Sequence, residues 1–532
     1  MKTLFVLVGV IAASFLEAAT LDPAVVPLLK RSFVHGREYF VLRSGRAKLI
    51  AQTDRADVAP GFLYLLFDAE NNAQTARKER AFNFGDGQGF VNSGLEVVLG
   101  GFAFSALGHQ TQTGWVKYEG IPGVEAVWWA GGLRVTERLL ALGDRGLFLR
   151  RVELTAANLG GPEVVSLRLS LPPGPCAVED GWLLQQGNGY RLGLGATDPW
   201  PTQAVPERSR IEIGPLSLSP GQTCSVDTLL LAGVAGADGS HPGGVPLLGP
   251  VNGSANSRAA AFVHAPRPET APPAQPLPAL APGNLIEETR RAWAAISTVD
   301  TQDATVREIY DKARFGLRAM VADNGVMDAG IFEYGAQWVR DTSNTLLGLV
   351  HAGHFELARR GFAYVLEHMV SAEGNAMIAG GFDDPDREQF DQMGELLHGL
   401  KAYRDWTGDD SLLRQHRARL LALIERPLRP EFRDATGMVH NRREFWERTF
   451  DDAYELAYQT YVVLGLRDAV ALAEPLGAHD RAERWRAEAN RIQAAMLNHP
   501  TCSLVEDGRL IKRRSISGEH IRTIRFPAAA AD

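Results

Sequence analysis

The hydrophobic pattern of the chain changes its period about midway along the sequence, and this change limits the fold more than any other feature. In the first part, large apolar residues alternate with polar ones over short runs such as 133–142, which is the pattern of half-buried strands. In the second part, apolar residues recur at helical spacing, as at Phe355, Phe362 and Met369. A chain with this order of patterns is expected to fold as a β-rich domain followed by a helical domain.

The two patterns are separated by a segment rich in Pro, Gly, Ala and Ser, which predicts a linker over 238–284. The 532 residues exceed the usual size of one domain, so two large domains are expected. We predict an antiparallel β-sandwich of the supersandwich type over 20–237 and helices paired by short loops over 285–532. The predicted helices cover 304–322, 342–353, 355–370, 388–407, 411–425, 453–475 and 480–497. Helix pairs of this kind, arranged in a circle, make an (α/α)6 toroid.

The N-terminal residues 1–19 have the composition of a signal peptide. Lys2 precedes a mostly apolar run from Leu4 to Leu16, and small residues follow at Ala18 and Ala19. The alternative is a buried N-terminal strand, because the residues three before a cleavage point here are large or charged. We expect export, to the periplasm or the medium. No other segment reaches the ~20 apolar residues that span a bilayer, so we expect no membrane partner.

Charge, cysteine content and motifs limit the partners, disulfides and cofactors that we expect. A net charge of −8 gives no basic field for nucleic acid. Three cysteines are too few for a disulfide framework, and Cys176 and Cys224 are interpreted either as one bridge or as free thiols. The acidic residues between Asp383 and Asp391 do not follow the calcium-loop pattern, and no dinucleotide fingerprint is present, so neither metal nor cofactor is expected.

The first candidate site segment runs from Tyr334 to Asp341, directly before a predicted helix. Sugar binding needs an aromatic ring against the C–H face of the sugar and charged groups that bond its hydroxyls, and Trp338, Arg340 and Asp341 supply both. The alternative is that Asp341 caps the helix, while Trp338 belongs to the core and Arg340 to the surface.

The second candidate segment contains Trp446 and Glu447. A carboxylic acid beside an indole is partly desolvated, which raises its pKa and lets it donate a proton near neutral pH. Glu447 is therefore the candidate general acid. The alternative is that Glu447 pairs with a neighbouring arginine on a solvated turn. Asp451 or Asp452 is expected to cap the helix that follows.

Together, these segments and the sequence between them resemble the six-hairpin glycosidases, in particular the glucoamylase family (glycoside hydrolase family 15) and its bacterial members that carry a sandwich. The residues that carry the resemblance are Trp338-Val339-Arg340-Asp341, Phe390-Asp391-Gln392-Met393-Gly394-Glu395-Leu396, Thr407-Gly408-Asp409, Trp446-Glu447 and Leu464-Gly465-Leu466-Arg467.

The resemblance implies an inverting exo-glucosidase that acts on α-glucosidic bonds of an oligo- or polysaccharide. Arg340 and Asp341 are then expected to bind the terminal glucose, Glu447 to be the general acid, and Tyr334, Trp338, Asp391 and Trp446 to contact the sugar. Inversion also needs a general base about 6.5–9.5 Å from the acid.

The resemblance places that base beyond residue 532. About seven helices are predicted where a closed toroid has twelve, so we expect an incomplete toroid that lacks the base, and the sequence leaves the activity of this form open. Two alternatives remain. One is an inverting sugar phosphorylase, in which phosphate replaces the attacking water. The other is a non-catalytic carbohydrate-binding protein.

Overall fold

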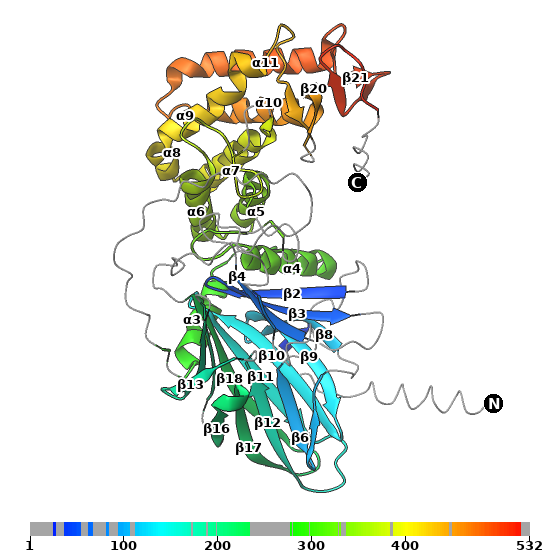
Figure 1. Cartoon of the computed structure of the whole chain (residues 1–532), viewed down its shortest axis with the longest axis vertical. Helices are drawn as coiled ribbons and strands as arrows, with labels where there is room; N and C mark the ends of the chain where they lie inside the picture. Colours follow the sequence, from blue (N-terminus) through cyan, green and yellow to red (C-terminus); the bar gives the residue numbers. More distant parts are fainter. Residues whose placement is uncertain are drawn as a thin grey trace, which may run out of the picture.

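The computed structural model describes residues 25–27, 37–54, 62–67, 81–83, 94–106, 112–171, 174–187, 190–197, 199–234, 277–278, 280–296, 298–327, 329–330, 337–382, 387–445 and 449–522. The predicted signal peptide and nearly all of the predicted linker lie outside these residues. Figure 1 shows most of the strands at one end of the long axis and most of the helices at the other, together with β20 and β21.

The first domain consists of antiparallel sheets. A nine-stranded sheet has the order β1-β8-β9-β10-β11-β18-β15-β14-β13, a five-stranded sheet the order β16-β17-β12-β6-β7, and a four-stranded sheet the order β2-β3-β4-β5. The strands are β1 (Val25–Pro27), β2 (Arg37–Ser44), β3 (Ala47–Asp54), β4 (Phe62–Phe67), β5 (Ala81–Asn83), β6 (Leu95–Leu99), β7 (Phe102–Phe104), β8 (Gln112–Tyr118), β9 (Ile121–Ala130), β10 (Leu133–Leu142), β11 (Leu147–Thr155), β12 (Glu163–Ser170), β13 (Cys176–Glu179), β14 (Trp182–Gly187), β15 (Tyr190–Ala196), β16 (Thr202–Val205), β17 (Arg210–Leu218) and β18 (Thr223–Val234).

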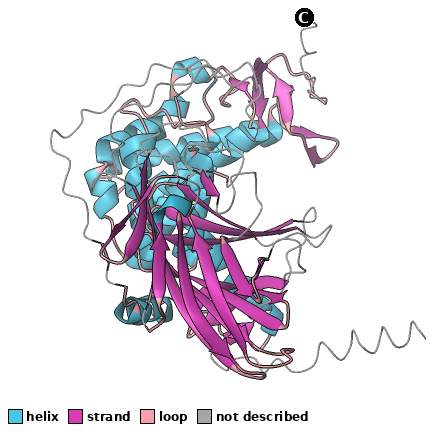
Figure 2. Ribbon diagram, turned by 60° about the horizontal axis from the view of Figure 1, so that its bottom comes forward, coloured by secondary structure: helices cyan, strands magenta, loops and turns pink. Residues whose placement is uncertain are grey.

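The alternating pattern places one face of each sheet in a common core. Leu133 and Val135 of β10 are buried together with Phe148 of β11 and Leu167 of β12, so the inner faces of the nine- and five-stranded sheets pack on each other. The outer face of the nine-stranded sheet is also apolar, and the partly buried side chain of Trp293 packs there. Figure 2 shows the strands as a layered body with helices above it.

The second domain is helical, and its helices begin and end close to the predicted positions, except for α3, which the sequence analysis did not predict. They are α3 (Gly283–Ala294), α4 (Ala304–Met320), α5 (Val339–His351), α6 (Phe355–Tyr364), η2 (Val365–Met369, a π-helical turn), α7 (Asp391–Thr407), α8 (Ser411–Gln415), α9 (Arg417–Glu425), α10 (Leu456–Ala471) and α11 (His479–Asn498). The prediction of antiparallel sheets followed by hairpin-forming helices is confirmed.

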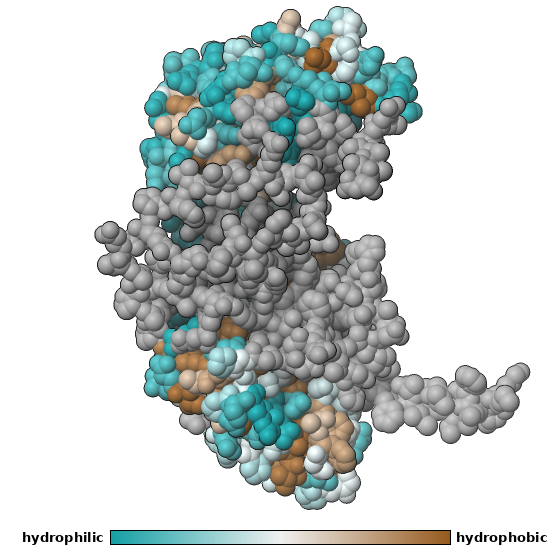
Figure 3. Space-filling view, in the orientation of Figure 1, coloured by the Kyte–Doolittle hydropathy of each residue, from teal (hydrophilic) through white to brown (hydrophobic). Residues whose placement is uncertain are grey.

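Three of these helices form an inner row. α7 packs against both α5 and α10, although α6 lies between the first pair in the sequence and α8 and α9 lie between the second. The residues of α7 from Asp391 to Leu397 are all buried, and α10 is mostly apolar, as is typical of helices covered on several sides. α11 instead has one buried stripe that includes Trp485 and Ile492, and Figure 3 shows a largely hydrophilic surface at its end of the molecule. The alternation of inner and outer helices is the arrangement expected of an α/α toroid.

Two local predictions are wrong. Asp451 and Asp452 do not cap a helix, because 449–455 forms strand β20 (Thr449–Glu455), which pairs with β19 (Asn441–Arg443) and β23 (Arg513–Ser515). A strand held by a partner some sixty residues away leaves no local signal. The predicted helix 411–425 is two helices, α8 and α9, that meet at His416.

The two domains are joined by direct contacts. Arg43 Nε of β2 donates to the carbonyl oxygen of Ala319 in α4 at 2.7 Å, and Lys117 Nζ of β8 pairs with Asp311 at 2.5 Å.

β21 (Val505–Glu506) and β22 (Arg509–Leu510) form a small hairpin that follows α11.

The cysteines are free thiols, which decides between the two interpretations of Cys176 and Cys224. Among the described helices, none is long and apolar enough to cross a bilayer.

Candidate active site

Arg340 lies at the point where the first candidate segment meets two others. Its Nη1 atom is 3.2 Å from Asp391 Oδ2, 3.2 Å from the carbonyl oxygen of Phe445 and 3.3 Å from Gln389 Oε1. The guanidinium carbon lies 4.5 Å from the centroid of the Phe445 ring, within the range of a cation–π contact. Arg340 therefore links the N-terminal turn of α5 to that of α7 and to the segment that leads into residue 446.

Asp341 and Trp338 occupy the same turn but differ in exposure. The Asp341 side chain is 39% exposed, and burial raises its pKa although Arg340, 3.8 Å away, opposes the shift. Trp338 is the residue before α5 and is 6% exposed, so its indole forms part of a wall and not an open platform. Asp341 stands inside the first turn, and Arg340 is turned inward, so the alternative of a capping Asp341 and a surface Arg340 is wrong.

The facing sides of α5 and α7 carry two matched pairs at a spacing of four residues. Asp391 pairs with Arg340, and Glu395 Oε1 accepts a hydrogen bond from Asn344 Nδ2 at 3.3 Å. Residues four apart lie on one face of a helix, so the two pairs are stacked one turn apart. Gln392 Oε1 also accepts from the backbone N–H of Arg340 at 3.2 Å, which fixes the two helices in register.

Glu395 has an unusual protonation state for a carboxyl group. It is 4% exposed, and burial, together with the negative charge of Asp391, raises its pKa to about 8. Glu395 is therefore a protonated acid at neutral pH and retains a proton that it can donate in a hydrogen bond.

In the segment that precedes the predicted general acid, both backbone polar groups of Phe445 are hydrogen-bonded to side chains. The N–H of Phe445 donates to Glu455 Oε1 at 3.1 Å, and its carbonyl oxygen accepts from Gln389 Nε2 at 3.1 Å as well as from Arg340. Glu444, 1% exposed, pairs with Lys512 Nζ at 2.5 Å. Burial raises the pKa of Glu455 to about 7.

The predicted site residues thus divide into two groups. The structure brings Arg340, Asp341, Trp338 and Asp391 together beside Phe445. Tyr334, Trp446 and Glu447 lie outside the described residues, and the sequence alone places Glu447 two positions after Phe445.

Sequence reasoning did not identify Glu395, Asn344, Gln389 or Glu455 as part of the site. A usable signal for two of them was the repeat of polar residues four apart on two helices with otherwise apolar faces. Within the described part of the chain, no group of three or more His, Cys, Asp or Glu side chains is arranged to hold a metal ion.

Comparison with known proteins gives matches to structures alone. No family model and no curated protein matches the sequence. The chain is similar to a bacterial glucoamylase complexed with acarbose, at 11% identity and a TM-score of 0.46 over 88% of this chain and 70% of that one. It is also similar to a protein assigned as a kojibiose phosphorylase from the human microbiome, at 7% identity and a TM-score of 0.47 over 88% and 71% of the two chains. A glycosyl hydrolase of family 92 shares 12% identity at a TM-score of 0.39, over 94% and 66% of the two chains.

The types of protein that the sequence resemblance implied, glucoamylases and sugar phosphorylases, are thus among the solved structures to which this chain is similar. With identities this low and TM-scores below 0.5, the chemistry of the site has to be argued from its own residues.

Proposed function

We propose that this chain is a glycoside-active enzyme, an inverting exo-glucosidase that removes terminal glucose from α-linked glucans. The observation that carries the proposal is the position of Arg340, which contacts both Asp391 and the carbonyl of Phe445. Arg340 therefore joins its own segment of the resemblance to that of Asp391, 51 residues away, and to Phe445, which is 105 residues away and directly precedes Trp446.

In the proposed mechanism, Arg340 and Asp341 bind the hydroxyls of the terminal glucose. Arg340 is held by Asp391 and Gln389, so little entropy is lost when it meets the sugar. Asp341, half-exposed in the same turn, is the acceptor for sugar hydroxyls. Trp338 supplies an apolar wall, and Tyr334 and Trp446 complete the sugar contacts. Asp391, which sequence reasoning placed among the sugar contacts, is completely buried and acts by holding Arg340.

Glu447 is assigned as the general acid. It donates its proton to the glycosidic oxygen as the bond from that oxygen to the anomeric carbon breaks. Water adds to the anomeric carbon from the opposite face and gives its proton to a carboxylate base, so the released glucose has the inverted configuration. The contacts that hold Phe445 between Glu455 and Arg340 fix the chain two residues before Glu447 and support this assignment.

The test is glucose release from maltooligosaccharides by this chain, and by the chain extended by any coding sequence that follows it. The anomer formed is read by NMR, and each assay is repeated with inorganic phosphate. Inverted glucose that does not depend on phosphate, and that is lost in Glu447→Gln and in Arg340→Met, supports the proposal. A sugar phosphate formed only with phosphate supports the phosphorylase alternative. Binding of maltooligosaccharide without turnover in either form supports a non-catalytic protein.

We also propose that the chain is exported, on the evidence of its first 19 residues. The test is the mass of the protein recovered from the periplasm or medium of expressing cells. A mass lacking the N-terminal segment supports export, and a full-length protein that stays in the cytoplasm contradicts it.

A further inference from the structure

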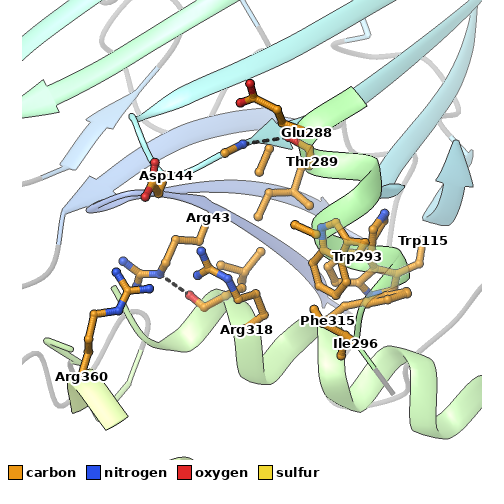
Figure 4. Close-up of a pocket in the computed structure, with 17 residues that line it drawn as sticks. Arg43, Trp115, Asp144, Glu288, Thr289, Trp293, Ile296, Phe315, Arg318 and Arg360 are labelled. Carbon is orange, nitrogen blue, oxygen red and sulfur yellow. Dashed lines mark hydrogen bonds between the residues drawn. The ribbon is translucent and has the colours of Figure 1, made fainter. Parts of the chain in front are cut away.

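A cavity of about 340 Å³ lies where the sandwich meets the helical domain. Its walls come from β2, β8, the turn after β10, α3, α4 and α6, and Figure 4 shows their side chains. Ligand pockets favour domain junctions, and this volume is within their usual range of roughly 300–1,000 Å³. None of its lining residues belongs to the candidate active site.

Three arginines, Arg43, Arg318 and Arg360, gather at one end of the cavity (Figure 4). Arg43 is committed to the domain junction, because it donates to the carbonyl oxygens of Ala319 and Met320 at 2.7 and 3.1 Å. Its charge nevertheless adds to the local positive potential. Arg318 and Arg360 are held less firmly, and they are the groups that can turn to a ligand.

Arg318 is largely uncompensated. It donates one hydrogen bond of 3.4 Å, to the carbonyl oxygen of Val321, and no ion pair within the described residues includes it. Burial, together with repulsion from Arg43 and Arg360, lowers the pKa of Arg318 to about 10, although attraction by Asp323 and Asp144 opposes the shift. Arg318 therefore remains charged at neutral pH. The nearest carboxylate to Arg360 is that of Glu356, which is 64% exposed, at 3.8 Å.

The carboxylates of the cavity stand at its solvent side. Asp144 and Glu288 are exposed, and within the described residues neither forms an ion pair with the three arginines. His354, nearby, does not add charge, because burial and the charges of Arg318 and Arg314 lower its pKa to about 4. The arginine end of the cavity therefore has an excess of positive charge, although Asp323 and Asp144 partly offset it.

The opposite end of the cavity is aromatic. Trp115, Trp293 and Phe315 form a cluster, with ring centroids 5.9 Å apart for Trp115 and Phe315 and 5.4 Å apart for Trp293 and Phe315. Figure 4 shows this group beside Ile296, away from the arginines. Aromatic faces bind the C–H face of a sugar ring, and Thr289, between the two ends, is a polar group that also lines the cavity.

We propose that this cavity binds a phosphorylated monosaccharide, with the phosphate held by Arg318 and Arg360 and the sugar ring lying against Trp115 and Trp293. Guanidinium groups bind phosphate through two parallel hydrogen bonds, which favours phosphate over a neutral hydroxyl. The occupant contacts both domains and therefore stabilises their junction. This proposal does not depend on the proposed hydrolysis.

The test is calorimetric titration of the full chain with glucose 6-phosphate, inorganic phosphate and glucose. We expect saturable binding of glucose 6-phosphate that is at least tenfold tighter than that of inorganic phosphate. Arg318→Met and Arg360→Met should each weaken it by roughly tenfold or more, which corresponds to the loss of one charge-assisted hydrogen bond. Arg318→Lys, which keeps the charge, should weaken it less.

Arg359→Met is the matched control, because Arg359 neighbours Arg360 in α6 but pairs with Glu356 at 3.0 Å outside the cavity. It should bind glucose 6-phosphate as the wild type does. Asp341→Asn, at the candidate active site, should also leave this binding unchanged, which separates the two proposals. Circular dichroism spectra and melting temperatures establish that each variant is folded.

Three results would overturn the proposal. One is the absence of saturable glucose 6-phosphate binding to the wild type. Another is equal affinity in folded Arg318→Met and Arg360→Met. The third is glucose binding as tightly as glucose 6-phosphate in a manner insensitive to both arginines. Equal affinity for inorganic phosphate and glucose 6-phosphate would overturn the role of the aromatic wall.

Discussion

Arg340 Nη1 lies 3.2 Å from Asp391 Oδ2, and this contact connects the first turns of α5 and α7. Asp391 is completely buried, whereas the Arg340 side chain is 15% exposed. A buried carboxylate needs a partner, and a partly exposed arginine can also meet a ligand. One ion pair therefore serves both the packing of the inner helices and the candidate site.

Arg340→Met should destabilise the protein by about 3–5 kcal/mol, because it leaves the Asp391 carboxylate buried without its charged partner. The double variant Arg340→Met/Asp391→Asn should recover part of this loss, since the uncompensated charge is then removed. Urea unfolding of the two single variants and the double variant measures the coupling energy between Arg340 and Asp391. Strict additivity of the three changes in unfolding free energy would contradict a stabilising ion pair between them.

Glu395 should make stability fall as pH rises. Its folded pKa of about 8 is higher than the ordinary value of a glutamate near 4.3, so the folded state binds the proton more tightly than the unfolded state. The stability associated with the protonated carboxyl is complete below pH 4.3 and is lost as pH rises through 8. The free energy of unfolding of the wild type, measured in urea, should therefore decrease between pH 5 and pH 8.6.

In Glu395→Gln the part of this loss due to Glu395 should disappear. Glu483→Gln is the control, because the Glu483 side chain is 83% exposed on α11, and it should keep the wild-type slope. Equal slopes in Glu395→Gln and Glu483→Gln would show that Glu395 is ionised in the folded protein.

Gly394→Ala should destabilise the contact between α7 and α10. A Cβ atom at Gly394 would lie 2.0 Å from the carbonyl oxygen of Tyr461, a backbone atom that cannot move without the helix. We expect a loss of about 1–3 kcal/mol in urea unfolding. At Gly316 of α4 a Cβ meets nothing within 4 Å, so Gly316→Ala should be neutral or should stabilise the protein by about 0.5–1 kcal/mol. Equal effects of the two substitutions would contradict this close approach.

Much of the fold could be predicted from the sequence because its causes are local. The alternation in 163–170 reflects burial of one sheet face, and the end of α7 at Gly408, with φ of 70°, reflects a backbone position that favours glycine. Strand β20 could not be predicted, because its local pairing with β19 is short and irregular and its other partner, Arg513–Ser515, is distant in the sequence.

The site was only partly predictable for the same reason. Arg340, Asp341 and Asp391 could be assigned to the site from the motifs that contain them. Glu395 lies in the same motif as Asp391, but its role, like that of Asn344, depends on α5 and α7 packing in one register. The arginine cavity has no sequence signal, since Arg43, Arg318 and Arg360 come together through the domain junction.

The measurement that tests the central claim most directly is kcat of the Glu447 variant on two substrates that differ in their leaving group. An acid that protonates the glycosidic oxygen contributes roughly 10²–10⁴-fold to the rate, whereas fluoride departs with little need for a proton. Glu447→Gln should therefore lose at least a hundredfold in kcat on maltotriose while keeping most of its activity on α-glucosyl fluoride, and Glu483→Gln should match the wild type on both. Equal losses on the two substrates, or no loss on maltotriose, would contradict the assignment of Glu447 as the general acid.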